Sequence, residues 1–194
     1  MQQESLLKHP LANQLLNWYQ KKHHICIDNS PKEVESIKSI FMLVETVLIP
    51  VSKKFGEIKI TYGFVSPELN RYIQRNSSSG TYPSTDQHAA SELNQANNQI
   101  CNRQGLACDF IVNGYEKQVG QIMLFIVNNL DFDKIYYYGN DKPLHVSVGH
   151  KSEKHLQIMN ISKNGRRIPG KKAYGNKAKV LAEELINVSI SEMP

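Results

Sequence analysis

The sequence predicts an α+β fold in which a mostly antiparallel sheet packs against helices. Apolar residues recur at helical spacing through the first 55 residues, whereas short runs with strand character gather after residue 57. Helices that come first and strands that are grouped late are typical of α+β proteins rather than of alternating α/β folds. The 194 residues, 40% of them hydrophobic, are sufficient for one domain with a substantial core.

The first part of the chain carries the helical patterns. Leucines at helical spacing predict a helix over residues 5–21. Ser30, Pro31 and Glu33 have the positions of an N-cap, a first-turn proline and a capping-box partner, so they predict a second helix start. The apolar stripe that follows predicts a long core helix, which Gly56 ends.

The second part of the chain carries the strands. Strands are predicted over residues 57–62, 106–112, 134–138, 144–148 and 155–161, the third and fourth as a hairpin. Helices are predicted after the N-cap Ser66 and over residues 117–129 and 176–187. The remaining long stretches are expected to be a mobile loop or poorly packed helix at 91–104 and a loop at 162–175.

Charge is unevenly distributed along the chain. The net charge is +5, but residues 151–179 hold nine Lys or Arg against one acid, so this segment is +8 and the remainder is −3. A strongly basic segment on a mildly acidic body points to contact with a polyanion, either nucleic acid or a charged envelope polymer. The alternative is a solvated basic surface that binds no partner, because charge alone carries little specificity.

The composition favours a cytoplasmic protein. No apolar run approaches the ~20 residues that span a bilayer, and the start lacks the basic and apolar regions of a secretory signal. The three cysteines, Cys26, Cys101 and Cys108, lack metal-type spacing and are expected to be reduced thiols. Cys108 is expected to be buried, on the face of its strand opposite to that of the neighbouring Asp109.

Three side chains, those of His88, Asp109 and His145, are the predicted metal ligands. Asp109 and His145 each lie inside a short apolar run, where burial of a charged or imidazole side chain is costly without a partner. Two imidazoles with one carboxylate form a common open zinc site. The alternative is that His145 is a core histidine with satisfied hydrogen bonds and that Asp109 is a cap or turn residue. His150 and His155 are expected on the surface.

Three segments resemble the signatures of the zinc D-alanyl-D-alanine carboxypeptidase family, which also contains dipeptidases, phage endolysins that cut peptidoglycan peptides, and the metal-binding domain of Hedgehog proteins. Residues 60–70, Ile-Thr-Tyr-Gly-Phe-Val-Ser-Pro-Glu-Leu-Asn, are similar to the strand–turn–helix signature of that family. Residues 86–88 and 105–109 resemble the two halves of its next signature, which carries a His and an Asp. Residues 144–147 resemble its last strand, which carries a second His.

The resemblance implies a Hedgehog/DD-peptidase-like fold and a Zn ion held by His88, Asp109 and His145. With it, the chain divides into three parts: an N-terminal helical extension (1–30), a zinc DD-peptidase-like domain (31–150), and a basic C-terminal extension with a closing helix (151–194).

Departures from the family pattern concern the groups around the metal. The first His and the Asp are 21 positions apart, farther than in the family, so residues 91–104 are an insertion beside the site. The family arginine that binds a substrate oxygen corresponds to Val65, which cannot replace a planar cationic fork. Arg71 or Arg75 are candidates to replace it. The family glutamate before the last His has no clear counterpart, and Asp141 is the only carboxylate within reach.

These observations predict a zinc-dependent metallopeptidase that hydrolyses D-amino-acid-containing or cell-wall-type peptides, with Asp141 as the catalytic base. Tyr62, Ser66 and Tyr138 are expected to bind the peptide substrate. The competing interpretation of Asp141 is an ordinary hairpin-turn residue. Two other functions stay open: a degenerate, non-catalytic metal-binding or interaction domain, and a nucleic-acid-associated protein that uses the basic segment.

Overall fold

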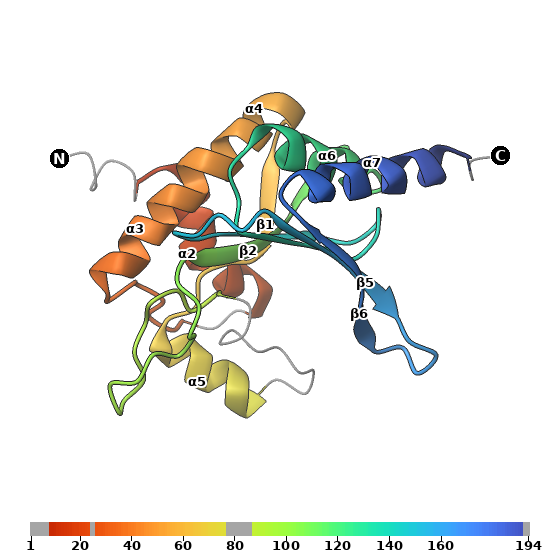
Figure 1. Ribbon diagram of the computed structural model, residues 1–194. Coiled ribbons are helices and arrows are strands. Elements are labelled where there is room, and N and C mark those ends of the chain that lie inside the picture. Colours follow the sequence, from red (N-terminus) through yellow and green to blue (C-terminus); the bar gives the residue numbers. More distant parts are fainter. Residues whose placement is uncertain (1–7, 24–25, 77–86, 192–194) are drawn as a thin grey trace.

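One mixed sheet of six strands organises the part of the chain that the computed structural model describes, residues 8–23, 26–76 and 87–191 (Figure 1). The strands lie in the order β1-β2-β4-β3-β5-β6. Their bounds are β1 Ile58–Tyr62, β2 Leu106–Val112, β3 Lys134–Tyr137, β4 Leu144–Val148, β5 His155–Ile161 and β6 Arg167–Tyr174. Only β3 and β5 pair in parallel, so the predicted α+β class with a mostly antiparallel sheet is confirmed at this level.

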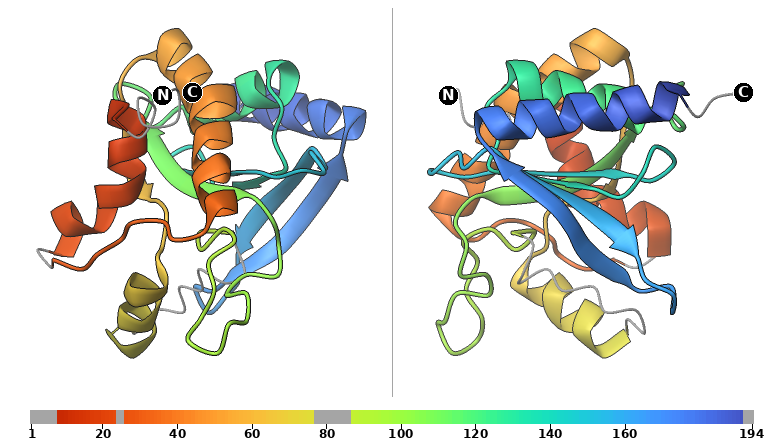
Figure 2. Two further views of the ribbon diagram at one scale, coloured as in Figure 1. Left: turned by 90° about the vertical axis from the view of Figure 1, so that its left-hand side faces the viewer. Right: turned by 45° about the vertical axis from the view of Figure 1, so that its right-hand side comes forward.

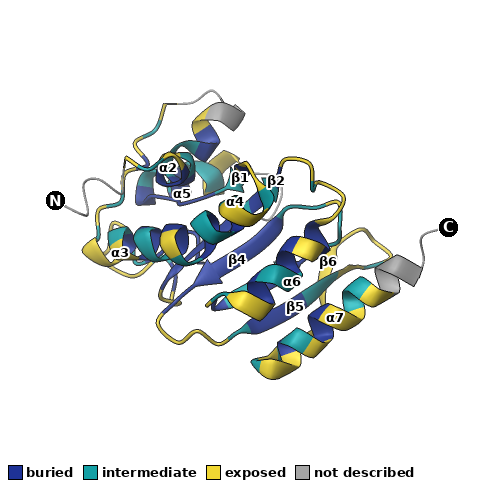
Figure 3. Ribbon diagram, turned by 90° about the horizontal axis from the view of Figure 1, so that it is seen from above, coloured by how far each residue is buried: buried dark blue, intermediate teal, exposed yellow. Residues whose placement is uncertain are grey.

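Helices cover both faces of the sheet. Their bounds are α2 Pro10–His23, α3 Val34–Leu43, η1 Val44–Leu48, α4 Ile49–Phe55, α5 Pro67–Asn76, α6 Val119–Asn129 and α7 Asn176–Ser191. The segments α3, η1 and α4 follow one another directly as the predicted long helix, with a π-helical stretch in the middle. Figures 1 and 3 show α3, α4, α6 and α7 on one side of the sheet, and Figure 1 shows α5 and the segment 87–104 on the other.

The hydrophobic core lies between the sheet and the helices α3, α4, α6 and α7. Strand β2 contributes Cys108 and Phe110 to it, and β4, which Figure 3 shows beneath the helices, contributes Val146. Since successive side chains on a strand point to opposite faces, Asp109 and His145 lie on the other face. The predicted ligands therefore share the face that α5 and the segment 87–104 border.

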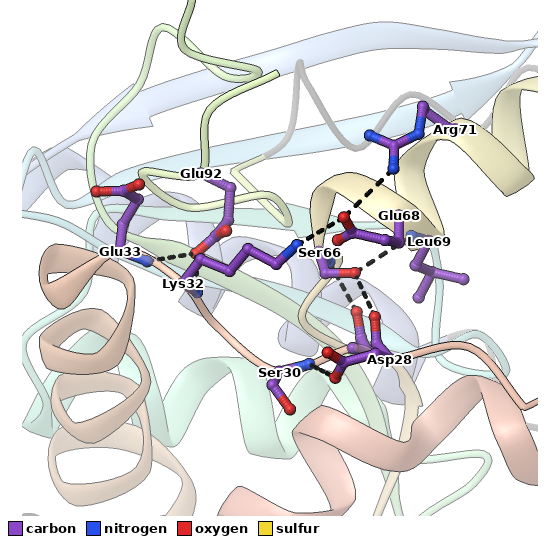
Figure 4. Close-up of polar contacts among 10 residues, drawn as sticks. Asp28, Ser30, Lys32, Glu33, Ser66, Glu68, Leu69, Arg71 and Glu92 are labelled. Atoms are coloured by element: carbon purple, nitrogen blue, oxygen red, sulfur yellow. Dashed lines mark hydrogen bonds and ion pairs between the residues drawn. The ribbon is translucent and has the colours of Figure 1, made fainter. Parts of the chain in front are cut away.

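The start of the long helix differs from the prediction. The capping box at Ser30 does not form, and helix α3 begins at Val34 without a side-chain cap of its own. Instead, the buried carboxylate of Glu92 accepts the backbone N–H groups of Lys32 at 3.0 Å and of Glu33 at 3.2 Å (Figure 4). A negative charge is favourable at a helix N-terminus, and here it comes from a residue far along the chain, which local sequence motifs do not reveal.

The stretch 91–104 is a turn-rich loop without a helix, and it is anchored to the body. Glu92 and Cys101 are buried, and a single bridge pairs Leu93 with Gln99. The carbonyl of Gln104 accepts the side-chain amide of Gln87 at 2.6 Å. The insertion is thus fixed at its start and its end relative to the sheet.

The prediction of a loop over 162–175 was wrong, because residues 167–174 form strand β6 and pair with β5. Most of its side chains are exposed, so the strand lacks the apolar alternation from which a strand is predicted. Its charged residues at the edge of the sheet are a feature that discourages pairing with another chain.

The described parts of the three expected segments, 1–30, 31–150 and 151–194, share one core, and the second and third also share the sheet. Leu15 and Trp18 of helix α2 belong to the same hydrophobic cluster as the strands, and β5 lies beside β3. Among residues 8–23, 26–76 and 87–191, no helix has the length and apolar character that a membrane span requires.

Candidate metal centre

The structure brings the three predicted ligands together. One potential ligand atom from each of His88, Asp109 and His145 lies within 4.8 Å of the other two, the single such His/Cys/Asp/Glu group in the described residues. The Asp109 Oδ1 and His145 Nδ1 atoms are 2.7 Å apart. Ligand atoms of a tetrahedral zinc site are separated by about 3.3 Å, given bonds of ~2.0–2.1 Å. The group therefore needs only small adjustments to hold a divalent cation.

Strand register places two of the ligands. Asp109 on β2 and His145 on β4 are direct cross-strand partners, and both point away from the core. Side chains directly opposite each other in an antiparallel pair have Cβ atoms about 4.5–5.5 Å apart. The antiparallel pairing of these two strands is thus sufficient to bring the carboxylate and the imidazole together.

His88 reaches the group from the loop that precedes β2. Its backbone carbonyl accepts the N–H of Val65 at 2.9 Å, and its Nδ1 lies 3.1 Å from the carbonyl of Gly63. A carbonyl only accepts, so Nδ1 donates, and the neutral ring then presents an unprotonated Nε2. Burial lowers the pKa of His88 to about 4, although the charge of Asp109 opposes this, so the imidazole is neutral near pH 7.

The turn that holds His88 is itself held by the N-terminal part of the chain. A Cβ atom on Gly63 would lie 2.4 Å from the carbonyl oxygen of Leu15, so only glycine fits this approach. The carbonyl of Phe64 accepts the indole N–H of Trp18 at 2.8 Å and the amide of Asn29 at 2.8 Å. Leu15, Trp18 and Asn29 therefore support the turn beside the metal centre.

Two tyrosine rings flank the histidines. A bulge in β1 pairs Tyr62 with Asp109. The ring of Tyr62 meets the ring of His88 edge-on, with 4.5 Å between the centroids. The ring of Tyr136 stacks on that of His145 at 4.7 Å and 17°. Both histidines are buried, whereas the Asp109 side chain is 28% exposed, so a ligand can approach from the side of the carboxylate.

The residues expected to bind substrate have different surroundings. Tyr62 lies against a metal ligand, as described above. Ser66 is fully buried; its hydroxyl donates to the carbonyl of Asp28 and accepts the N–H of Leu69 as the predicted N-cap of α5 (Figure 4). The carbonyl of Tyr138 accepts a bond from Arg167, whose guanidinium lies 5.2 Å from the centroid of that tyrosine ring. Of the three, Tyr62 contacts the metal group, through the ring of His88.

Asp141 is not part of the metal group. Its carboxylate is exposed in the turn between β3 and β4 and accepts a bond from the Lys142 ammonium at 2.8 Å. This bond, aided by the charge of Lys142, lowers the pKa of Asp141 below its ordinary value. The predicted role as catalytic base stays a prediction.

Arg71, a candidate to replace the family arginine, and Arg103 also differ in their contacts. Arg71 lies 3.3 Å from Glu68, which Lys32 also contacts at 2.6 Å (Figure 4). Arg103, from the 91–104 insertion, donates from Nη1 to the hydroxyl of Tyr136 at 3.2 Å. Sequence reasoning missed both Arg103 and Tyr136. The register of the predicted β3–β4 hairpin, which places Tyr136 opposite His145, is the signal that reveals the tyrosine.

The two histidines that follow the site strand behave differently. His150 is exposed, as predicted. The prediction for His155 was wrong, because it is 9% exposed and its ring stacks on Tyr174 at 4.4 Å. Burial lowers the pKa of His155, and the nearby ammonium of Lys134 adds to this. Cys108 is buried, as predicted.

Comparison with known proteins adds no family assignment, since no protein-family model, curated protein or solved structure matches this chain.

Proposed function

We propose that this chain is a zinc-dependent metallopeptidase with a Hedgehog/DD-peptidase-like fold, acting on D-amino-acid-containing or cell-wall-type peptides. The observation that supports it most is the convergence of His88, Asp109 and His145 within 4.8 Å on one face of the sheet. Two imidazole nitrogens and one carboxylate oxygen suit zinc and leave a fourth position open. Zinc supplies Lewis acidity and lowers the pKa of a coordinated water to ~7.

The protein's own groups orient the ligands. The bond from His88 Nδ1 to the carbonyl of Gly63 fixes the ring and its tautomer, and the stacked ring of Tyr136 restrains His145. Such partners of metal ligands influence affinity by about 10–100-fold. The side chain of Asp109 is 28% exposed, which gives solvent access to one of the three ligands.

Peptide hydrolysis also requires a base, and Asp141 is the proposed one. We expect the zinc-loaded protein to show little or no activity on free D-Ala-D-Ala, but to cleave a cell-wall-type pentapeptide, with loss of activity after chelation. Asp141→Asn is expected to reduce cleavage by about 10²–10⁴-fold, the usual contribution of a general base, while zinc stays bound. Amino acid release and zinc content are measured together.

Asp131→Asn is the matched control, because Asp131 is also exposed and pairs with a lysine, Lys154 at 3.0 Å. Equal cleavage by the Asp141 variant and the parent would make Asp141 a turn residue. If the zinc-loaded parent cleaves no peptide, the chain is instead a degenerate, non-catalytic metal-binding or interaction domain. The buried Val65 and the exposed Lys142–Asp141 pair favour that alternative.

We further propose that the basic hairpin, which consists of β5, β6 and the turn between them, contacts a polyanion such as nucleic acid. It projects from the body in Figures 1 and 2. Its cationic side chains are exposed, and among the described residues none of them forms an ion pair with a carboxylate: Lys163, Arg166, Arg167, Lys171 and Lys172. A row of unneutralised cations on a projecting ribbon suits contact with phosphates.

Charge reversal tests whether the basic hairpin binds a polyanion. The double variant Lys171→Glu/Lys172→Glu is expected to lower the slope of log affinity against log salt by roughly 2 on a DNA duplex, because about one counterion is released for each neutralised phosphate. Lys53→Glu/Lys54→Glu, at the end of α4, changes the net charge equally and is the control. If both double variants bind DNA with the salt dependence of the parent, the hairpin is a solvated surface.

A further inference from the structure

Arg103 lies on a segment whose position is fixed beside the metal centre. The neighbouring Cys101 is 2% exposed, and the carbonyl of Gln104 accepts the side chain of Gln87, the residue before the ligand His88. Gly105 follows with φ +102°, and a Cβ atom there would lie 1.8 Å from the carbonyl oxygen of Val148. The backbone around Arg103 is therefore held between the loop that carries one ligand and the end of the strand that carries another.

The guanidinium of Arg103 connects to the metal ligands through one side chain. Its Nη1 donates to the hydroxyl of Tyr136 at 3.2 Å, and the ring of that tyrosine is stacked on His145. One aromatic ring and one hydrogen bond thus connect the cation to a metal ligand.

The guanidinium is also accessible from solvent. Arg103 is exposed, and it borders a hollow of about 370 Å³ that is also lined by Lys134, Asp133 and Glu153 but by none of the three metal ligands. A guanidinium presents several N–H groups in a fork, so it can keep its bond to the tyrosine hydroxyl and also donate to a carboxylate. Exposure reduces the strength of such a contact, because water screens it.

We propose that Arg103, positioned by Tyr136, binds a carboxylate of the peptide that the metal centre holds, so that the site favours peptides with a free carboxyl terminus near the bond at the metal. This inference rests on the proposed function. The anchor comes from the 91–104 insertion and not from helix α5, where Arg71 contacts Glu68. Arg103 acts on specificity and makes no bond to the reacting atoms.

Two thiol probes distinguish the contribution of Arg103 to binding from that of the metal. Mercaptoacetyl-glycine and its carboxamide both offer a thiolate to a cobalt-loaded protein, and only the acid offers a carboxylate to the arginine. Thiolate-to-cobalt absorption reports binding of each probe without any need for catalysis. The parent is expected to bind the acid about tenfold more tightly than the amide, as suits a charge-assisted contact.

Arg103→Gln is expected to abolish this preference while cobalt content and the affinity for the amide stay unchanged. Tyr136→Phe, which keeps the stacked ring, is expected to reduce the preference severalfold. Arg71→Gln is the matched control and is expected to retain it. A preference that survives in Arg103→Gln, or that disappears in Arg71→Gln, would overturn the assignment.

The outcomes distinguish this inference from the proposed function. If the cobalt-loaded parent binds acid and amide equally, Arg103 is not an anchor, although the metal centre stands. If neither thiol reaches the cobalt, the coordination sphere is closed, and both the anchor and the hydrolytic function are contradicted. If the protein takes up no cobalt at all, the proposed metal centre fails and the anchor fails with it.

Discussion

Replacement of His88, Asp109 or His145 by alanine is expected to lower zinc affinity by more than about a hundredfold. Even changes in the partners of metal ligands cost about 10–100-fold, and each of these variants removes a ligand itself. The parent is expected to retain about one zinc per chain after dialysis, since three protein ligands with one open position are typical of a zinc site. Zinc content by mass spectrometry and competition with a chelating dye measure the effect.

His150→Ala is the matched control for these variants, because His150 is an exposed histidine close in sequence to His145. Zinc content in this variant is expected to equal that of the parent. A parent-like circular dichroism spectrum shows whether the ligand variants are folded. Zinc that persists at one per chain in all three ligand variants would place the metal elsewhere.

Trp18→Ala is expected to destabilise the whole protein by about 3–5 kcal/mol, the usual cost of truncating a large buried aromatic residue. Trp18 is 5% exposed, its ring lies 4.1 Å from that of Tyr62, and its indole N–H bonds the carbonyl of Phe64. The same change removes a support of the turn that holds His88, so zinc affinity is expected to fall as well. Urea denaturation and zinc titration provide the two measurements.

Trp18→Phe is the control, because it keeps most of the ring packing and loses the bond to the Phe64 carbonyl. The expected cost is about 0.5–1.5 kcal/mol, the net contribution of one hydrogen bond, because the Phe64 carbonyl keeps its bond from Asn29. If Trp18→Ala costs less than ~1 kcal/mol, helix α2 is a separable extension that does not support the site.

Sequence patterns predicted those helices and strands whose buried side chains follow the spacing of apolar residues in the sequence. The long helix that ends at Gly56 carries its apolar stripe on one face, and strands β2 and β4 are continuous apolar runs interrupted only by Asp109 and by His145 with Ser147. These interruptions also revealed two of the three residues in the metal group. A polar residue in an apolar strand is informative because its burial requires a partner.

The features that sequence reasoning missed depend on contacts between distant segments. The cap of α3 comes from Glu92, so the local motif at Ser30 was misleading. Strand β6 is exposed on both faces and gives no apolar signal. Tyr136 joins the site through strand register, and Arg103 through the path of an insertion, which no periodicity encodes.

X-ray absorption at the zinc edge of the zinc-loaded protein tests the metal centre most directly. We predict a first shell of nitrogen and oxygen atoms alone at ~2.0–2.1 Å. Outer-shell scattering from two imidazole rings is expected in the parent and from one ring in His88→Ala loaded with excess zinc. A sulfur shell at ~2.3 Å would assign the metal to a cysteine. That result, or a parent spectrum without imidazole scattering, would contradict the site formed by His88, Asp109 and His145.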